Sequence, residues 1–292
     1  MNNQDNEKVF QKSQINWYPG HMARTKREIQ EKLDLIDIVF EVIDARVPYS
    51  SKNKDIDMLV SNKPRILIMT KKDLCDEKIT NQWKQYYINK GYKVILLDLL
   101  HDSNLNDIYN VVNEYVKIIN DKRREKGLKP RKTRVLILGI PNVGKSTLIN
   151  RLVKKRVTNV GNKPGVTKSL EWIRINDNLE LLDTPGILWP KLDNREIALN
   201  LASTTAIKEE ILNKEEVAIH IINKLLCNYK DNIINRYHIT NVCDIVSILD
   251  EIGKHIGAIR NNEVDYDKVY NIILKDLREG HLGRITLDIY ED

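Results

Sequence analysis

The sequence predicts an α/β fold: a mostly parallel sheet with helices on both faces, followed by a small all-α C-terminal domain. Three observations predict it. Short apolar segments rich in branched residues alternate with helical periodicity over the first two thirds of the chain. Polar or glycine-rich turns follow the carboxyl ends of these segments, where open parallel sheets bind their ligands. From about Arg195 onward, long helical periodicity continues without comparable strands.

The front of the chain supplies a helix and three strands. Residues 22–34 carry Ile29 and Leu33 on one helical face among charged side chains, which predicts a helix. The segments rich in Val, Ile and Leu predict strands at residues 36–43, 65–69 and 93–97.

The middle of the chain continues the alternation. We expect a helix at residues 104–122, a strand at 134–138, a further helix, and a strand at 179–182. Residues 217–226 are typical of the helical texture that follows. We therefore predict a polar N-terminal extension (1–14), a sheet domain (15–192) and a helical domain (193–292).

The composition excludes several classes of protein. Of the 292 residues, 41% are hydrophobic and 30% are charged, which is typical of a soluble globular protein. No apolar run reaches the roughly 18 residues of a bilayer span, and residues 1–13 lack a signal-peptide core, so we expect no membrane partner. The absence of a basic leader favours a bacterial cytoplasm. Three separated cysteines indicate neither a zinc site nor a disulfide framework: Cys75, Cys227 and Cys243.

The net charge of +6 is mild, but its distribution is uneven. Basic residues gather between Lys122 and Arg134, with only Asp121 and Glu125 opposing them. Such a run can neutralise a nucleic-acid backbone. A solvated helix end and linker is the equally weighted alternative.

A phosphate-binding loop separates the strand at 134–138 from the next helix. The pattern Gly139-x4-Gly144-Lys145-Ser146 lets backbone N–H groups surround phosphates, while Lys145 reaches the β and γ oxygens and Ser146 ligates Mg²⁺. A chance match is the alternative, but the strand–loop–helix context argues against it. The expected nucleotide contacts are Asn142, Val143, Gly144, Lys145, Ser146 and Thr147.

A second motif, Asp183-Thr184-Pro185-Gly186, follows the strand at 179–182. We expect Asp183 to hold Mg²⁺ through water and the Gly186 N–H to contact the γ-phosphate. A simple turn is the alternative reading. Between the two motifs, Thr167 is a candidate first-switch residue whose hydroxyl closes on Mg²⁺ when the γ-phosphate is present.

A third motif, Thr70-Lys71-Lys72-Asp73, ends the strand at 65–69. The Asp73 carboxylate can accept two hydrogen bonds from guanine, which adenine cannot supply, and Lys71 would lie over the base. Thr70 replaces the usual Asn, and the Ser-Ala loop expected at guanine O6 is unrecognisable in residues 97–101. We therefore expect weakened base recognition; without the other motifs a plain turn would be an even alternative.

The order of these motifs is inverted. In a Ras-like GTPase the phosphate loop comes first and the base motif late, whereas here the base motif precedes the phosphate loop. The inversion predicts a circularly permuted Ras-like GTPase domain.

Four further segments carry a resemblance to a known family. The chain resembles the ribosome biogenesis GTPase A (RbgA/YlqF) family in residues 16–23 (NWYPGHMA), 44–51 (DARVPYSS), 183–191 (DTPGILWPK) and 283–286 (GRIT). The resemblance implies a GTP/GDP-binding protein that binds the maturing large ribosomal subunit, with a C-terminal helical domain on ribosomal RNA and no DNA partner.

The resemblance also implies how hydrolysis proceeds. Ile187 stands where Ras-like enzymes place a water-orienting glutamine, so intrinsic hydrolysis should be slow and stimulated by the large subunit. The family suggests His21 as the residue that positions water and Asn142 as a K⁺ ligand. The catalytic candidates are thus His21, Lys145 and Gly186. A capping histidine and a turn asparagine are the structural alternatives, and Arg46 is either a charge near the nucleotide or an ion-pair residue.

Three functions are compatible with these motifs. The first is a GTP-hydrolysing assembly factor whose second switch, at residues 187–193, pulls on the helical domain. The second is an RNA-binding scaffold that guanine nucleotide regulates without essential turnover. The third, a phosphate-loop ATPase or metabolite kinase, conflicts with Asp73.

Overall fold

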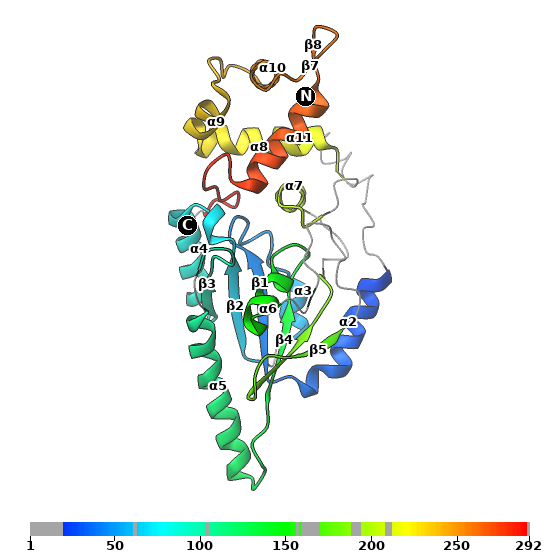
Figure 1. Cartoon of the computed structure of the whole chain (residues 1–292), viewed down its shortest axis with the longest axis vertical. Coiled ribbons are helices and arrows are strands. Elements are labelled where there is room, and N and C mark those ends of the chain that lie inside the picture. Colours follow the sequence, from blue (N-terminus) through cyan, green and yellow to red (C-terminus); the bar gives the residue numbers. More distant parts are fainter. Residues whose placement is uncertain are drawn as a thin grey trace.

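The chain folds into a six-stranded sheet, and a helical region lies above the carboxyl ends of its parallel strands (Figure 1). This computed structural model describes residues 20–60, 63–102, 105–155, 158, 170–187, 194–207 and 212–290. The strand order is β3-β2-β1-β4-β6-β5, and every neighbouring pair is parallel except β5 and β6. The strands are β1 (Ile38–Asp44), β2 (Arg65–Thr70), β3 (Lys93–Leu96), β4 (Thr133–Leu138), β5 (Glu171–Arg174) and β6 (Leu179–Asp183).

Helices cover both faces of the sheet, which confirms the predicted fold class. Ile38, Phe40 and Val42 of β1 pack on α5 (Asn106–Glu125) and α6 (Lys145–Val153). Val39 and Ile43 point to the other face, where they pack with α2 (Gly20–Lys32), η1 (Leu33–Leu35), α3 (Lys54–Leu59) and α4 (Glu77–Asn89). The short helix η2 (Lys72–Leu74) follows the carboxyl end of β2. Because both faces are covered, β1 is buried throughout, and its residues are apolar except for Glu41 and Asp44.

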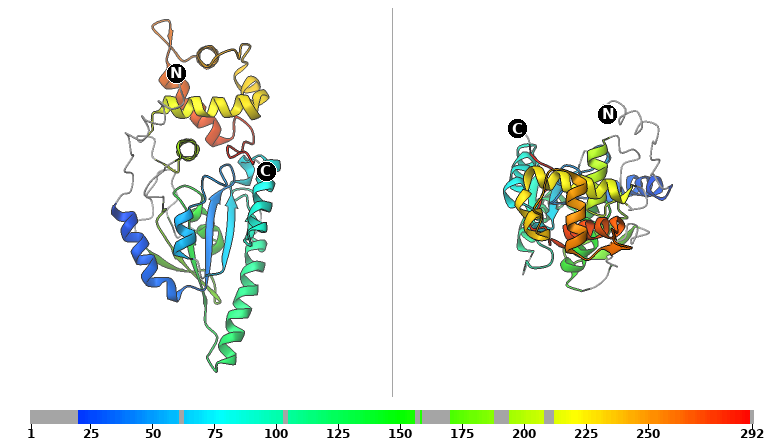
Figure 2. Two further views of the ribbon diagram at one scale, coloured as in Figure 1. Left: turned by 180° about the vertical axis from the view of Figure 1, so that it is seen from behind. Right: turned by 90° about the horizontal axis from the view of Figure 1, so that it is seen from above.

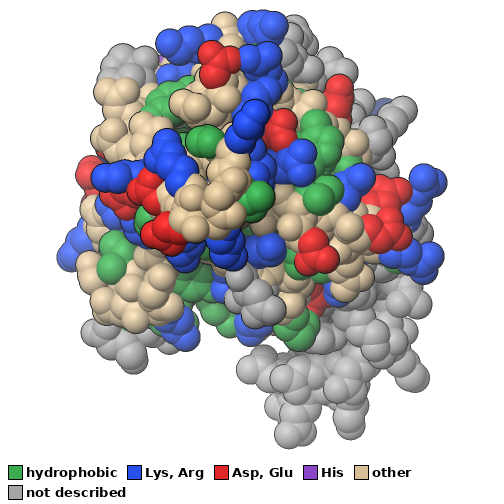
Figure 3. All heavy atoms as spheres, turned by 90° about the horizontal axis from the view of Figure 1, so that it is seen from below, with side chains coloured by type: hydrophobic (Ala, Val, Ile, Leu, Met, Phe, Trp, Pro, Cys, Tyr) green, Lys and Arg blue, Asp and Glu red, His purple; other side chains and the backbone are tan. Residues whose placement is uncertain are grey.

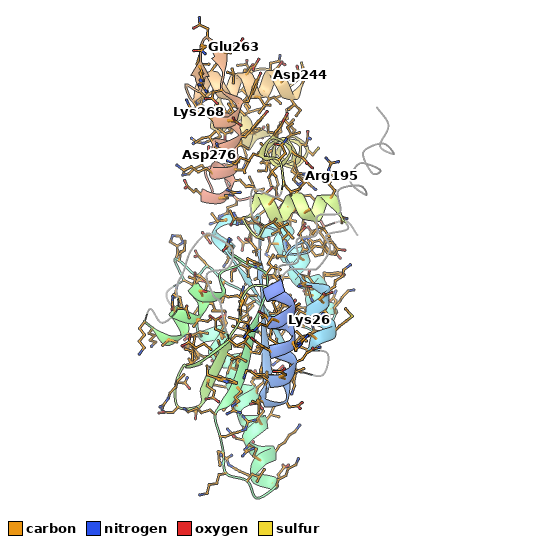
Figure 4. The ribbon with its side chains drawn as sticks, turned by 90° about the vertical axis from the view of Figure 1, so that its right-hand side faces the viewer. Lys26, Arg195, Asp244, Glu263, Lys268 and Asp276 are labelled. Carbon is orange, nitrogen blue, oxygen red and sulfur yellow. The ribbon has the colours of Figure 1, made fainter. Side chains whose placement is uncertain are left out.

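The helical region has a separate core. Seen from above, its helices lie over the sheet (Figure 2). They are α7 (Arg195–Ser203), α8 (Lys214–Asn228), α9 (Lys230–Tyr237), α10 (Ile245–His255) and α11 (Tyr266–Glu279), with a short hairpin of β7 (Ile259–Arg260) and β8 (Glu263–Val264). Figure 4 labels Asp276 on α11, inside this region, and Lys26 on α2 beside the sheet. No helix in the described ranges has the length and hydropathy needed to cross a membrane.

Two segments connect the two cores. In α7, Leu201 joins the core on the sheet, while Ala198 and Ala202 join the core of the helical region. The C-terminal tail, residues 285–290, returns to the sheet: the N–H of Ile285 donates to Leu74 O and the N–H of Leu287 to Arg46 O. The domain division at residues 192 and 193 stays a prediction.

The basic run lies at the end of α5 that points away from the helical region (Figure 1). Its ion pairs are Arg124 with Asp121, Arg131 with Asp37, and Arg134 with Glu180. Viewed from this end, Lys and Arg side chains are interspersed with acidic ones (Figure 3). Part of the run therefore stabilises the fold, and its contact with nucleic acid stays a prediction.

Candidate functional site

The phosphate-binding loop connects β4 to α6 at the carboxyl edge of the sheet. A Cβ atom on Gly139 would lie 2.3 Å from the carbonyl oxygen of Val42, so only glycine fits there. The N-cap of α6, Gly144, has no side chain to bond the first-turn N–H groups. These N–H groups and the positive end of the helix dipole form a site for an anion.

Lys145 is the first residue of α6 and is buried below the loop. Its Nζ donates to the carbonyl oxygens of Gly139 (3.1 Å) and Ile140 (2.7 Å). Burial lowers the pKa of Lys145, and the Asp183 carboxylate opposes that change. The structure thus places the Lys145 ammonium inside the loop, where a phosphate chain would lie.

Asp183 ends β6, directly beside β4 and its loop. The residue is 2% exposed, and its Oδ1 has no hydrogen-bond partner among the residues that the structure describes. Burial raises the pKa of Asp183, while Lys145 lowers it. A buried carboxylate oxygen without a donor suits a hydrated cation, so the residues present fit Mg²⁺.

The segment after Asp183 packs on the phosphate-binding loop. A Cβ atom on Gly186 would lie 2.6 Å from the Pro141 nitrogen. The Ile187 N–H donates to Gly139 O (3.1 Å), and the Ile187 carbonyl accepts from Asn53 Nδ2 (3.1 Å). Two of the predicted motifs therefore touch, as the γ-phosphate-sensor interpretation requires.

The base motif meets the same loop from the other side. The Thr70 hydroxyl donates to the carbonyl of Val143 at 2.6 Å. Lys71 has a left-handed backbone, and its Nζ donates to Asp44 Oδ2 at 2.7 Å. Asp73 follows in η2, and burial, with a contribution from Asp98, raises the pKa of its carboxyl.

A pocket of about 320 Å³ lies between the base motif and the loop. The segment 97–101 closes one side with Leu99 and Leu100, although it carries no Ser-Ala motif. Asp98 Oδ1 accepts from the N–H groups of Leu100 (2.8 Å) and His101 (2.9 Å), which fixes the turn. The lining residues are Arg46, Thr70, Lys71, Asp73, Leu74, Leu99, Leu100, Gly144, Thr147, Thr204, Thr205 and Arg278.

The pocket wall includes residues that sequence reasoning missed. Thr204 and Thr205 follow α7, and Arg278 comes from α11, more than a hundred residues after the phosphate-binding loop. No local motif marks them. Arg46 carried a signal, because it lies in the DARVPYSS segment, and the structure makes it both an ion-pair residue and a pocket residue.

Asn142, the predicted K⁺ ligand, adopts a left-handed backbone with φ 60°. Its Nδ2 donates to the carbonyl of Thr205 at 2.7 Å, so the side chain connects the phosphate-binding loop to the turn after α7. Ser146 lies in the first turn of α6. The backbone of His21 lies in α2, but its side chain, like Thr167 and residues 188–193, is outside the described residues.

Sequence comparisons agree with this geometry. A family model described as a 50S ribosome-binding GTPase matches residues 134–261. Ribosome biogenesis GTPase A of Bacillus licheniformis is 44% identical, over 95% of this chain and 99% of that protein. Its counterpart in Thermotoga maritima is 28% identical over 95% of both chains. Mitochondrial ribosome-associated GTPase 1 of Xenopus tropicalis is 29% identical over 93% of this chain and 94% of that protein.

Solved structures share the fold. The structure of GNP-bound YlqF from T. maritima aligns with a TM-score of 0.62 at 24% identity, covering 92% of this chain and 99% of that one. A GDP-bound YlqF structure aligns with the same TM-score. From the three joined motifs and the 44% identity over nearly the full length of both proteins, we conclude that the chain belongs to the ribosome biogenesis GTPase A family.

Proposed function

We propose that this protein hydrolyses GTP as an assembly factor that binds the precursor of the large ribosomal subunit and its RNA. The observation that carries the proposal is the meeting of three permuted motifs at one edge of the sheet. Thr70 bonds the phosphate-binding loop at Val143, and Gly186 packs on the same loop at Pro141. One site could therefore bind the guanine base through the base motif, the phosphates through the loop and the γ-phosphate through the sensor at Gly186.

Different residues of the site bind the phosphates and Mg²⁺ in this proposal. The N–H groups of residues 142–147 and the Lys145 ammonium hold the β- and γ-phosphates, and the Gly186 N–H binds the γ-phosphate. Ser146 and Asp183 would hold Mg²⁺, with Thr167 completing the set. When bound, Mg²⁺ neutralises charge that develops on the phosphate oxygens.

His21 positions the attacking water in this proposal. Ile187 cannot do so because its side chain has no hydrogen-bonding atom. Asn142 would hold K⁺, a cation that supplies positive charge beside the phosphates where other GTPases use an arginine. Both assignments rest on the family resemblance and on the positions of residues 21 and 142 in its motifs.

The main test is GTP hydrolysis with and without large ribosomal subunits, in potassium and in sodium buffers. We expect slow turnover alone, and stimulation by the subunit that is larger in potassium. His21→Ala should remove the stimulated rate, whereas the exposed His255→Ala serves as the matched control. No stimulation by the subunit would contradict the proposal.

The scaffold alternative makes a different prediction. Under that alternative, His21→Ala protein binds and releases subunit precursors normally while hydrolysing no GTP. The nucleotide then only sets the affinity of the protein for the precursor. The ATPase alternative is tested by competition of GTP and ATP for a fluorescent guanine nucleotide. Asp73 favours GTP because adenine offers no matching pair of donors.

The inverted motif order also gives the nucleotide a route to the helical domain. In the sequence, residues 187–194 alone separate Gly186 from α7, so we propose that γ-phosphate binding repositions the helical domain on ribosomal RNA. Subunit precursors should then bind more tightly with a non-hydrolysable GTP analogue than with GDP. Equal affinities would rule this route out.

A further inference from the structure

We infer that Arg46 is a guanine-specificity residue, whose Nη1 donates to the O6 and N7 edge of the base. The inference rests on the proposed function, in which Asp73 accepts the N1 and N2 protons of guanine. Arg46 would then supply the hydrogen-bond donor to guanine O6 that the Ser-Ala loop provides in other GTPases.

Arg46 is held in one orientation. Its Nε donates to Asp44 Oδ1 at 3.1 Å and its Nη2 to Asp44 Oδ2 at 2.9 Å, so the planar guanidinium faces the carboxylate as a fork. Burial acts to raise the pKa of Asp44, but Arg46 and Lys71 outweigh it and hold the pKa well below its usual range. The pair therefore stays charged and keeps the guanidinium in place.

The third nitrogen of this guanidinium has a different environment. Nη1 is buried and has no hydrogen-bond partner among the described residues, although Arg46 is only 3% exposed. A buried donor without a partner is costly, and the cost is larger for a charged group. An ion pair with Asp44 accounts for Nε and Nη2 but not for Nη1. Because Arg46 lines the pocket, a ligand acceptor is the natural partner.

Four other donor residues at or beside the pocket already have acceptors within the protein. The N–H groups of Leu100 and His101, in the segment that replaces the Ser-Ala loop, donate to Asp98. Lys71 Nζ donates to Asp44, and Arg278 donates through Nε and Nη2 to the carbonyls of Ser203 and Ala202.

Guanine offers the acceptors that Arg46 requires. Its O6 and N7 lie on one edge, and arginine is their commonest protein partner. Adenine places an amino group at the position of O6, so a guanidinium there meets a donor instead of an acceptor. Asp73 and Arg46 would thus reject adenine from two edges of the base, which offsets the loss of the usual Asn at Thr70.

The test is a cycle between protein and ligand, with affinities of the full chain for GDP and 6-thio-GDP. Sulfur at position 6 weakens the acceptor but keeps the donors that Asp73 reads. We expect wild-type protein to bind 6-thio-GDP about tenfold more weakly than GDP, because one good base contact is worth about 1–3 kcal/mol. Arg46→Lys should bind GDP about tenfold more weakly and lose most of the difference between the two ligands.

Arg236→Lys is the matched control, since Arg236 also pairs with a buried aspartate (Nε to Asp276 Oδ2, 2.7 Å) but does not line the pocket. It should keep the wild-type ratio. If Arg46→Lys lowers both affinities by the same factor, its role is structural and the inference fails. If Arg46→Lys does not fold, Arg46→Gln is compared in the same way. Equal binding of GDP and 6-thio-GDP by wild-type protein would overturn the inference by itself. Failure of wild-type protein to prefer GDP over ADP would instead overturn the proposed function.

Discussion

Gly186 sits where no side chain fits. A Cβ atom there would lie 2.6 Å from the nitrogen and 2.8 Å from Cα of Pro141, both in the backbone of the phosphate-binding loop. Gly186→Ala must push the sensor away from the loop, so we expect affinity for a non-hydrolysable GTP analogue to fall about tenfold while GDP affinity changes little. Fluorescent-nucleotide titrations measure both, with GDP as the internal control. An equal loss of affinity for both nucleotides would mean that the substitution had disrupted the phosphate-binding loop itself.

His220 should make the protein sensitive to mild acid. Burial lowers the pKa of His220 from 6.5 to about 4, and the ring bonds Asn200 Oδ1 at 2.7 Å. Between these two pKa values the unfolded chain binds more protons than the folded chain, so stability falls as pH decreases from 6.5 toward 4. We expect a loss of about 1–2 kcal/mol between pH 7 and pH 5.

Denaturant unfolding at both pH values measures this loss. His220→Gln keeps a donor for Asn200 but does not titrate, so its stability should change less between the two pH values. If both proteins lose stability equally, other groups are responsible.

Residues in short motifs were the predictable part of the site. Lys145, Asp183 and Gly186 follow from spacing and from the chemistry of phosphate and Mg²⁺, and the structure brings them together. Thr204, Thr205 and Arg278 were not predictable, because only the packing of α7 and α11 brings them to the pocket. Arg46 was partly predictable. Its motif could be recognised in the sequence, but only the fold shows that its Nη1 has no hydrogen-bond partner among the described residues.

At the scale of elements, one buried carboxylate adds several hydrogen bonds to those that the backbone of the C-terminal tail makes. Asp288 accepts hydrogen bonds from the N–H groups of Tyr49 (2.7 Å) and Ser50 (2.7 Å), the Ser50 hydroxyl (2.6 Å) and Asn200 Nδ2 (2.8 Å). Asp288→Ala leaves the N–H groups of Tyr49 and Ser50 without this acceptor, while Asn200 Nδ2 keeps only the Ser50 hydroxyl (3.2 Å), so the free energy of unfolding should fall by about 2–4 kcal/mol. Urea titration measures it. Asp267→Ala, at an exposed position on α11, should cost about 0.5 kcal/mol or less.

The strong strands were predictable and the weak ones were not. Segments 65–69 and 134–138 match β2 and β4 to within one residue because buried parallel strands are continuous apolar runs. β5 was missed since it is a four-residue antiparallel edge strand with one buried side chain, Ile173. The hairpin of β7 and β8 has two residues in each strand and leaves no periodicity to detect.

On the scale of the whole molecule, the end of α7 links the nucleotide site to the helical region. Asn142 of the phosphate-binding loop donates to Thr205 O, and Arg278 of α11 donates to the carbonyls of Ala202 and Ser203 at 3.1 Å each. The same turn lines the pocket. Nucleotide binding and docking of the helical region should therefore stabilise each other, by the same factor in both directions.

Arg278→Ala tests this link. We expect about five- to tenfold weaker binding of GDP and of a GTP analogue alike, because the contact is at the base end of the site. Hydrogen exchange in α7 and α11 should slow on adding either nucleotide to wild-type protein, and slow less in the variant. Lys275→Ala, exposed on the same helix, is the control. Protection by the GTP analogue alone would assign the link to the γ-phosphate instead.

The fold class and family were predictable for the whole molecule, because motif order and long signature segments are properties of the sequence. The closeness of the two cores was not, since the tail and α7 make their contacts across large distances in the chain.

The return of the tail to the sheet has a consequence for the order of events during synthesis. Residues 285–290 are translated after every other element described, yet Asp288 closes on a loop that follows β1, the first strand to be made. Domains generally fold as units, and N-terminal domains fold first as the chain grows. A growing chain can thus assemble its sheet early, but the N–H groups of Tyr49 and Ser50 gain the Asp288 carboxylate as their acceptor only after α11 has been translated.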